Sequence, residues 1–280
     1  MNVKEMKLFA NDIRRETIKC IGHLGVGHIG GALSIVDVLA VLYGGVMNVD
    51  PSDPKKDDRD MLVCSKGHAG PAVYATLALK GYFPMEMLET LNQLGTNLPS
   101  HCDMNRTPGI DMTTGSLGQG ASTAMGIACG NRLKGYDNYT YLILGDGEIE
   151  EGQVWEAAMF AGAKKLTHVI AFVDYNKCQI DGYVEDLCAL GDVTKKFESF
   201  GWFAQNVEDG HDVEQIAAAI EKAKAQNEKP SVIVLNTVKG KGYSKIEGSL
   251  GSHNMPVSAE QMAEALAEMD AERAAIEKEA

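Results

Sequence analysis

The chain has 280 residues, of which 45% are hydrophobic and 23% are charged, a composition typical of a globular protein. Its formal net charge of -13 argues against sequence-independent binding to nucleic acid or to an anionic membrane surface. The six cysteines include no CxxC pair, so we expect reduced thiols rather than a zinc site. The N-terminus is charged, and the longest apolar stretch, residues 38–49, is too short to span a bilayer, so we expect a cytoplasmic protein.

Helical and strand patterns alternate along the chain. Apolar residues at helical spacing predict an amphipathic opening helix over residues 6–24 and an apolar helix over residues 32–46. The expected strands are residues 61–64, 140–144, 169–173, 202–207 and 231–235. The helices expected after them include residues 154–163, 213–225 and, at the end of the chain, an amphipathic helix at about 258–278. This order predicts an α/β fold, with a doubly wound, mostly parallel sheet flanked by helices, in a single domain of residues 1–280.

Polar residues follow two neighbouring strands of this predicted sheet. The motif Gly145-Asp146-Gly147 ends one strand, although such a pair of residues alone is more typical of a plain turn. Asn176 follows the next strand, 30 residues after Asp146, which fits one crossover between adjacent parallel strands. A carboxylate and an amide oxygen, with a nearby backbone carbonyl, suit a hard cation that takes its other ligands from phosphate and water. The sequence therefore predicts a magnesium or calcium site, and not a zinc site, at Asp146 and Asn176.

The segment from Gly145 to Cys178 resembles the diphosphate-binding domain of thiamine diphosphate enzymes. The resemblance implies that Asp146, Asn176 and the backbone carbonyl of Cys178 hold Mg²⁺, for which Ca²⁺ or Mn²⁺ can substitute. It also implies that Gly147 lies against the diphosphate of thiamine diphosphate. Ile180, close to this turn, either packs on the thiazolium ring or fills the core.

Four histidine motifs narrow the resemblance to transketolases. They are GVGHIGGALS around His28, CSKGHAGPAVYA around His68, LPSHCDMNRTPG around His101 and GSHNMP around His253. One such histidine alone is more typical of a structural residue, but the four occur together in the order of the family. The resemblance covers nearly the whole chain. It implies transfer of a two-carbon ketol unit from a ketose phosphate to an aldose phosphate, as in the pentose phosphate pathway.

The same resemblance assigns roles to the histidines. His68 and His253 are expected to contact the diphosphate, while His28, His101 and His253 are expected to surround the reacting carbon of the sugar and its hydroxyls. Imidazole suits these roles because its near-neutral pKa allows it to donate a hydrogen bond or to relay a proton.

Two further segments carry expected site residues. The segment TTGSLGQG opens a helix, and its backbone at Gly115, Ser116 and Leu117 is expected to contact the cofactor. Ser116 stands where relatives commonly have proline. Glu151 matches an acidic residue that in the family faces the subunit interface and belongs to a proton relay. The preference of helix starts for acidic residues explains Glu151 equally well.

No segment resembles the pyrimidine-binding domain that supplies the activating glutamate in thiamine enzymes. We therefore expect a split enzyme whose separate C-terminal subunit carries that domain and most of the residues that bind the sugar phosphate, in a heterotetramer with two copies of each chain. Two alternatives remain open: the α subunit of a thiamine-dependent 2-oxo acid dehydrogenase, and a non-catalytic scaffold half.

Two segments look like nucleotide- or phosphate-binding motifs, but the first match is interpreted as coincidental, and the second resembles the strand-to-loop segment that precedes the last histidine in transketolases. Residues 25–30 match the dinucleotide fingerprint GxGxxG, but the residues before them are helical and charged rather than strand-like. Residues 239–242, KGKG, lack the GK[ST] ending of a phosphate-binding loop.

Overall fold

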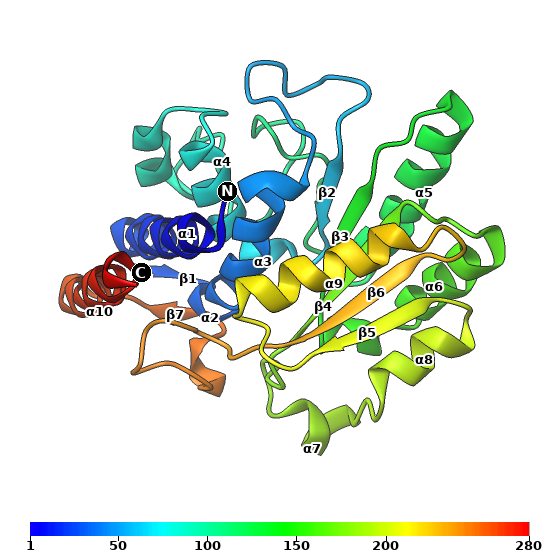
Figure 1. Cartoon of the computed structure of the whole chain (residues 1–280). Helices are drawn as coiled ribbons and strands as arrows, with labels where there is room; N and C mark the ends of the chain where they lie inside the picture. The colour runs from blue at the N-terminus through cyan, green and yellow to red at the C-terminus, as the bar shows by residue number, and fades with distance from the viewer. Residues whose placement is uncertain (280) are drawn as a thin grey trace.

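The computed structural model describes residues 1–279, and at its centre lies a parallel sheet of five strands (Figure 1). Across the sheet the strands are β2 (Met61–Cys64), β3 (Thr140–Gly145), β4 (Val169–Tyr175), β6 (Ser231–Asn236) and β5 (Phe203–Val207). The register places Gly145 of β3 beside Asp174 of β4, and Tyr175 of β4 beside Asn236 of β6. The carboxyl ends of these three strands therefore meet at one edge, where ligands bind in sheets of this type.

The central strands are apolar on both faces because helices cover both sides of the sheet. In β3, Tyr141 and Ile143 belong to one hydrophobic core, whereas Leu142 and Leu144 belong to the other. The first core is shared with helices α1 (Val3–Leu24), α2 (Ile29–Leu33), α3 (Val36–Val41), α4 (Gly70–Leu79), α9 (Val213–Ala225) and α10 (Ala259–Lys278). The second is shared with α5 (Gln119–Lys134), α6 (Gly152–Lys164), α7 (Val184–Cys188) and α8 (Val193–Ser199). This arrangement confirms the predicted doubly wound α/β fold.

The first and last long helices lie side by side (Figure 1). Each begins with a capping box, formed by Asn2 and Glu5 in α1 and by Ser258 and Gln261 in α10, which satisfies free backbone N–H groups of the first turn. The predicted terminal helix at about 258–278 is confirmed as Ala259–Lys278, with Ser258 as its cap.

The helix expected over residues 32–46 is broken in the structure. The segment forms α2, α3 and a π-helical turn, η1 (Leu42–Val46), within which Gly45 has a φ of 156°. The 18 residues Ile29–Val46, with a mean hydropathy of 1.9, are long and apolar enough to cross a membrane by length and composition. This corrects the shorter apolar stretch expected from the sequence. The segment is 89% buried within the protein and contributes to the first core, as expected of a core segment.

A second, two-stranded sheet joins the two ends of the chain. Strand β1 (Val26–Gly27) pairs antiparallel with β7 (Met255–Pro256), with Gly27 opposite Met255. The ribbon brings His28, which follows β1, close to His253, which precedes β7. Strands of two residues are too short to produce a periodic pattern, so this pairing was not expected.

Candidate active site

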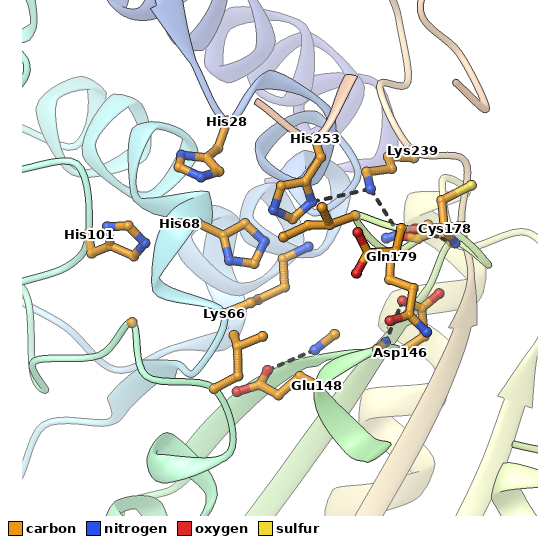
Figure 2. A pocket seen from close by; sticks show the side chains of 18 residues that line it. His28, Lys66, His68, His101, Asp146, Glu148, Cys178, Gln179, Lys239 and His253 are labelled. Atoms are coloured by element: carbon orange, nitrogen blue, oxygen red, sulfur yellow. Dashed lines mark hydrogen bonds between the residues drawn. The ribbon is translucent and has the colours of Figure 1, made fainter. Parts of the chain in front are cut away.

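A cavity of about 300 Å³ lies at the carboxyl ends of β3, β4 and β6 (Figure 2). Most residues expected at the site line it: His28, His68, His101, Gly115, Leu117, Asp146, Gly147, Asn176, Cys178, Ile180 and His253. Ser116 and Glu151 do not line it. Ser116 is exposed, and Glu151 is an exposed residue at the N-terminus of α6. The structure therefore brings together the residues from both ends of the chain and from the two central strands.

Asp146 lies directly after Ile143, Leu144 and Gly145 of β3 and is only 3% exposed. Its carboxylate accepts hydrogen bonds from two backbone donors, the N–H of Gly147 at 2.8 Å and the N–H of Lys177. Within residues 1–279 it forms no ion pair with a basic side chain. Burial, and then the nearby charge of Asp174, raise the pKa of Asp146 to about 7. A buried carboxylate without a protein cation is a favourable position for a metal ion.

Asn176 and Cys178 supply the other expected oxygen ligands. The side-chain nitrogen of Asn176 donates to Asp174 at 2.9 Å, and its oxygen accepts from the backbone N–H of Cys178 at 3.1 Å. The carbonyl oxygen of Cys178 accepts from the ammonium of Lys239 at 3.0 Å.

These oxygens form a partial ligand set. In the described part of the chain, no group of three or more His, Cys, Asp or Glu side chains could hold a metal ion by itself. One carboxylate, one amide oxygen and one carbonyl fit a hard cation whose coordination is completed by phosphate oxygens and water. The donors present therefore fit Mg²⁺ bound together with a diphosphate.

The four histidines form a cluster on the other side of the cavity (Figure 2). The ring centroid of His28 lies 5.4 Å from His68, 5.5 Å from His101 and 5.4 Å from His253. Burial lowers the pKa of all four. The pKa of His68 falls well below its usual value, and that of His253 falls to about 4, also because of the charge of Lys239. At neutral pH the cluster is therefore uncharged, and each ring offers one donor and one acceptor nitrogen.

The loop before α5 approaches the histidines closely. Gly115 has a φ of 148°, and a Cβ atom there would lie 3.0 Å from the ring of His101. Both facts require glycine at this position. A Cβ atom at Gly147 would likewise lie 3.0 Å from the Cβ of Gln179. The backbone at these two glycines therefore forms a wall that has no room for side chains.

Five site residues were missed from the sequence: Lys66, Glu148, Asp174, Gln179 and Lys239. All except Asp174 line the cavity, and Asp174 lies fully buried beneath it. Glu148 accepts hydrogen bonds from Ser65 and from the backbone N–H groups of Gly118 and Gly145, so it joins three loops that form the cavity.

Some of these residues stand beside recognised motifs. Lys66 comes two residues before His68, and Glu148 directly follows the GDG motif. Lys239 belongs to the KGKG segment, for which no site role was predicted, yet this buried lysine lines the cavity. By contrast, residues 25–30 lie between α1 and the first turn of α2 and include the short strand β1, which is outside the five-stranded sheet. They therefore lack the structural context of a dinucleotide fingerprint.

Comparison with known proteins identifies the family. Residues 5–276 match the family described as transketolase, thiamine diphosphate binding domain. The chain belongs to the transketolase family. This confirms the resemblance inferred from the histidine motifs and supports thiamine diphosphate as the cofactor.

Two curated relatives, each named as one subunit of a transketolase, match the chain along nearly their whole length. The chain is 57% identical, over 265 residues, to the 6-deoxy-6-sulfo-D-fructose transketolase subunit of Clostridium sp. (strain MSTE9), covering 95% of this chain and 96% of that protein. It is 36% identical, over 279 residues, to an apulose-4-phosphate transketolase subunit of Phocaeicola vulgatus, covering 100% of this chain and 99% of that protein.

Solved transketolases are longer. The transketolase of Campylobacter jejuni superposes with a TM-score of 0.90 at 30% identity, over 99% of this chain and 46% of that chain. The transketolase of Leishmania mexicana gives a TM-score of 0.90 at 32% identity, over 97% of this chain and 44% of that chain. The chain therefore spans less than half the length of these solved transketolases.

Proposed function

We propose that the chain is the N-terminal, diphosphate-binding subunit of a split transketolase that uses thiamine diphosphate and Mg²⁺. The observation that carries this proposal is the cavity that Asp146, Asn176 and Cys178 line together with a cluster of four uncharged histidines. Two curated relatives of matching length are named as transketolase subunits, which supports the same conclusion.

The residues divide the work of binding and catalysis. Asp146, Asn176 and the Cys178 carbonyl would hold the metal ion, and Gly147 and His68 would contact the diphosphate. When bound, thiamine diphosphate supplies an electron sink for the charge that develops when the C2–C3 bond of the ketose breaks.

The histidines handle the hydroxyl groups of the sugar. Breaking the C2–C3 bond converts the C3 hydroxyl into a carbonyl and therefore requires removal of its proton. His28, His101 and His253 are buried enough to stay neutral, so an imidazole nitrogen is free to accept that proton at neutral pH. The ring centroids of His101 and His253 lie within 5.5 Å of that of His28, and the three rings together orient the hydroxyl groups of the ketose by hydrogen bonds.

A separate C-terminal subunit with a pyrimidine-binding domain completes the enzyme, with two copies of each chain, in the cytoplasm. Two apolar side chains that line the cavity support this part of the proposal, because Leu117 is 38% exposed and Ile180 is 64% exposed. Glu151 is exposed at the start of α6, in a position where a partner subunit would bury it.

For the donor we propose 6-deoxy-6-sulfo-D-fructose in place of the ketose phosphate expected from the sequence. The support is the 57% identity to a subunit of a transketolase named for that sugar. Transfer of C1 and C2 from this six-carbon ketose to an aldose phosphate leaves a four-carbon aldose that carries the sulfonate.

A paired-donor assay tests the proposal. The chain, with and without its partner subunit, is incubated with thiamine diphosphate, Mg²⁺ and glyceraldehyde 3-phosphate, and the four-carbon aldose is detected by mass spectrometry. The donors are 6-deoxy-6-sulfo-D-fructose and, as a matched control, fructose 6-phosphate, which differs only in the group at C6. We expect product only with the partner present and mainly from the sulfonated donor.

Each alternative predicts a different result. Full activity of the chain alone contradicts the split enzyme, and equal use of both donors contradicts the sulfonate preference. Oxidation of a 2-oxo acid with an artificial electron acceptor would instead indicate the dehydrogenase alternative. Calorimetry that shows no binding of thiamine diphosphate with Mg²⁺ to the assembled complex would indicate a scaffold.

A further inference from the structure

The buried carboxylate of Asp174 receives hydrogen bonds from four different segments around the cavity. Its donors are Ser34 at 2.7 Å, Lys66 at 2.5 Å, Asn176 at 2.9 Å and the hydroxyl of Thr237. Ser34 lies between α2 and α3, and the other three residues follow β2, β4 and β6. Asp174 is 1% exposed and does not line the cavity, so it acts on the site through these neighbours and through its charge, which also raises the pKa of Asp146.

This arrangement leaves Asp174 unable to bind a metal ion itself. Ser34, Lys66 and Asn176 all bond to Oδ2, Thr237 bonds to Oδ1, and the carboxylate does not line the cavity. The ammonium of Lys66, only 2% exposed, also compensates the negative charge. Apart from its charge, Asp174 therefore acts on the site by orienting the side chains that donate to it.

Asn176 is the donor for which orientation matters most. Its amide group has an oxygen end and a nitrogen end, and only the nitrogen end can donate to an acceptor-only carboxylate. With the nitrogen at 2.9 Å from Asp174, the oxygen points the other way, to the backbone N–H of Cys178 and the cavity. A rotation of the amide by half a turn would set two oxygens against each other and present to the metal a nitrogen that cannot ligate it.

We propose that Asp174 is a positioning residue that holds the Asn176 amide with its oxygen toward the metal ion. The proposal rests on the proposed function, because it assumes that Asn176 is a metal ligand. It extends that function by naming the group that selects which end of the amide meets the metal. Partners that orient ligands in this way are worth about 10–100-fold in metal affinity.

The experiment is a calorimetric titration of Mg²⁺ into the assembled complex at saturating thiamine diphosphate. For Asp174→Asn we expect the Mg²⁺ dissociation constant to rise about 10–100-fold, while kcat at saturating Mg²⁺ stays within about two-fold of the wild type. The matched control is Ser34→Ala, which removes a hydrogen bond to the same carboxylate but leaves the contact to Asn176. It should change the Mg²⁺ dissociation constant by less than about three-fold.

Other outcomes distinguish a failure of the positioning role of Asp174 from a failure of the proposed function. An unchanged Mg²⁺ affinity in Asp174→Asn, beside a wild type that binds normally, overturns the positioning role and leaves the proposed function intact. A loss of kcat that excess Mg²⁺ does not restore also overturns it, because that is the result of a merely structural role. A wild type that binds neither Mg²⁺ nor thiamine diphosphate overturns both.

Asp174→Asn leaves Lys66 buried without its partner, and this variant can fail to fold. The double variant Lys66→Met with Asp174→Asn removes both charges and keeps the interior neutral. It is measured against Lys66→Met with Asp174→Leu, which has no polar group to orient the amide. The positioning role predicts weak Mg²⁺ binding in both double variants, and wild-type affinity in either one contradicts it.

Discussion

The ends of β3 and β4 carry the same type of residue in opposite electrostatic situations. Asp146 and Asp174 are 3% and 1% exposed and lie at the carboxyl ends of adjacent parallel strands. Burial raises the pKa of both carboxyls, but the charge of Lys66 and several hydrogen bonds reverse the shift at Asp174 and hold its pKa below its usual value. Asp146 has only backbone donors, and its pKa rises to about 7.

The comparison distinguishes a carboxylate that stabilises the fold, Asp174, from one that is available for ligand binding, Asp146. The charge at Asp174 is compensated from within the chain and joins the loops of the site. Within residues 1–279 the charge at Asp146 has no protein cation, so the free energy of its burial would be recovered on binding of the proposed metal ion. Burial alone does not distinguish the two residues; the charge of Lys66 and the side-chain hydrogen bonds to Asp174 do.

The largest expected effect comes from removal of the cation at Asp174. Lys66→Met leaves a buried carboxylate unpaired, and we expect the free energy of unfolding to fall by about 3–5 kcal/mol in urea denaturation at neutral pH. Lys56→Met, which removes an exposed lysine paired with Asp58, is the control and should cost less than about 1 kcal/mol. A loss below about 1 kcal/mol in Lys66→Met would remove the distinction between the two strand ends.

At Asp146 we expect stability to depend on the added metal ion rather than on a protein cation. The assembled wild-type complex should gain about 2.7 kcal/mol of stability at ligand concentrations 100-fold above the dissociation constant, and Asp146→Ala should lose this metal-dependent gain. Thermal unfolding with and without Mg²⁺ and thiamine diphosphate measures it. Asp181→Ala, an exposed acidic residue at the same cavity, is the control and should keep the gain. A full metal-dependent shift in Asp146→Ala would show that Asp146 is not a ligand.

A smaller effect is expected at Asp37, a second buried carboxylate whose charge is compensated by basic residues of the chain. It should appear as a dependence of the free energy of unfolding on pH. Asp37 is buried away from the cavity, with Arg14 and His211 each 2.8 Å from its carboxylate. Burial raises the pKa of Asp37, but Arg14 and His211 lower it by a larger amount, so the net pKa lies below its usual value of 3.8. Its contribution to stability is therefore present above pH 3.8 and is lost as the pH falls through the folded-state pKa.

Replacement of this carboxylate tests the sign. We expect Asp37→Asn to reduce the free energy of unfolding by about 2 kcal/mol at neutral pH, and we expect the difference from wild type to shrink as the pH falls below 3.8. Urea denaturation across that range provides the measurement. A difference that grows on acidification would mean that burial, and not pairing, controls Asp37.

The sequence predicted those parts of the site that depend on regular structure. Asp146 and Asn176 were placed together because the ends of neighbouring parallel strands meet at one edge of a sheet. The strands themselves were predicted to within about two residues, because continuous apolar runs mark strands that are covered on both faces.

The residues that were missed depend on contacts between distant segments. Lys66 and Asp174 are 108 positions apart, and neither has a local pattern that distinguishes a buried ion pair from two surface charges. The breaks between α2, α3 and η1 were missed because the long apolar run outweighed the glycine pairs at 30–31 and 44–45, which are unfavourable in a helix interior.

Because β1 pairs with β7, the histidine cluster is completed later during synthesis than the part of the site at the ends of β3 and β4. The three proposed metal ligands follow the neighbouring strands β3 and β4, and all are present once the ribosome has passed Cys178. His28 is held close to His253 by the pairing of β1 with β7, two strands that lie near opposite ends of the sequence. Such long-range pairings form late because the long loop between them is costly to close. A nascent chain therefore carries both strands of its metal site while its histidine cluster is still incomplete. Premature termination before Met255 would leave a protein with the strands of the metal site but without the ribbon that aligns its imidazoles.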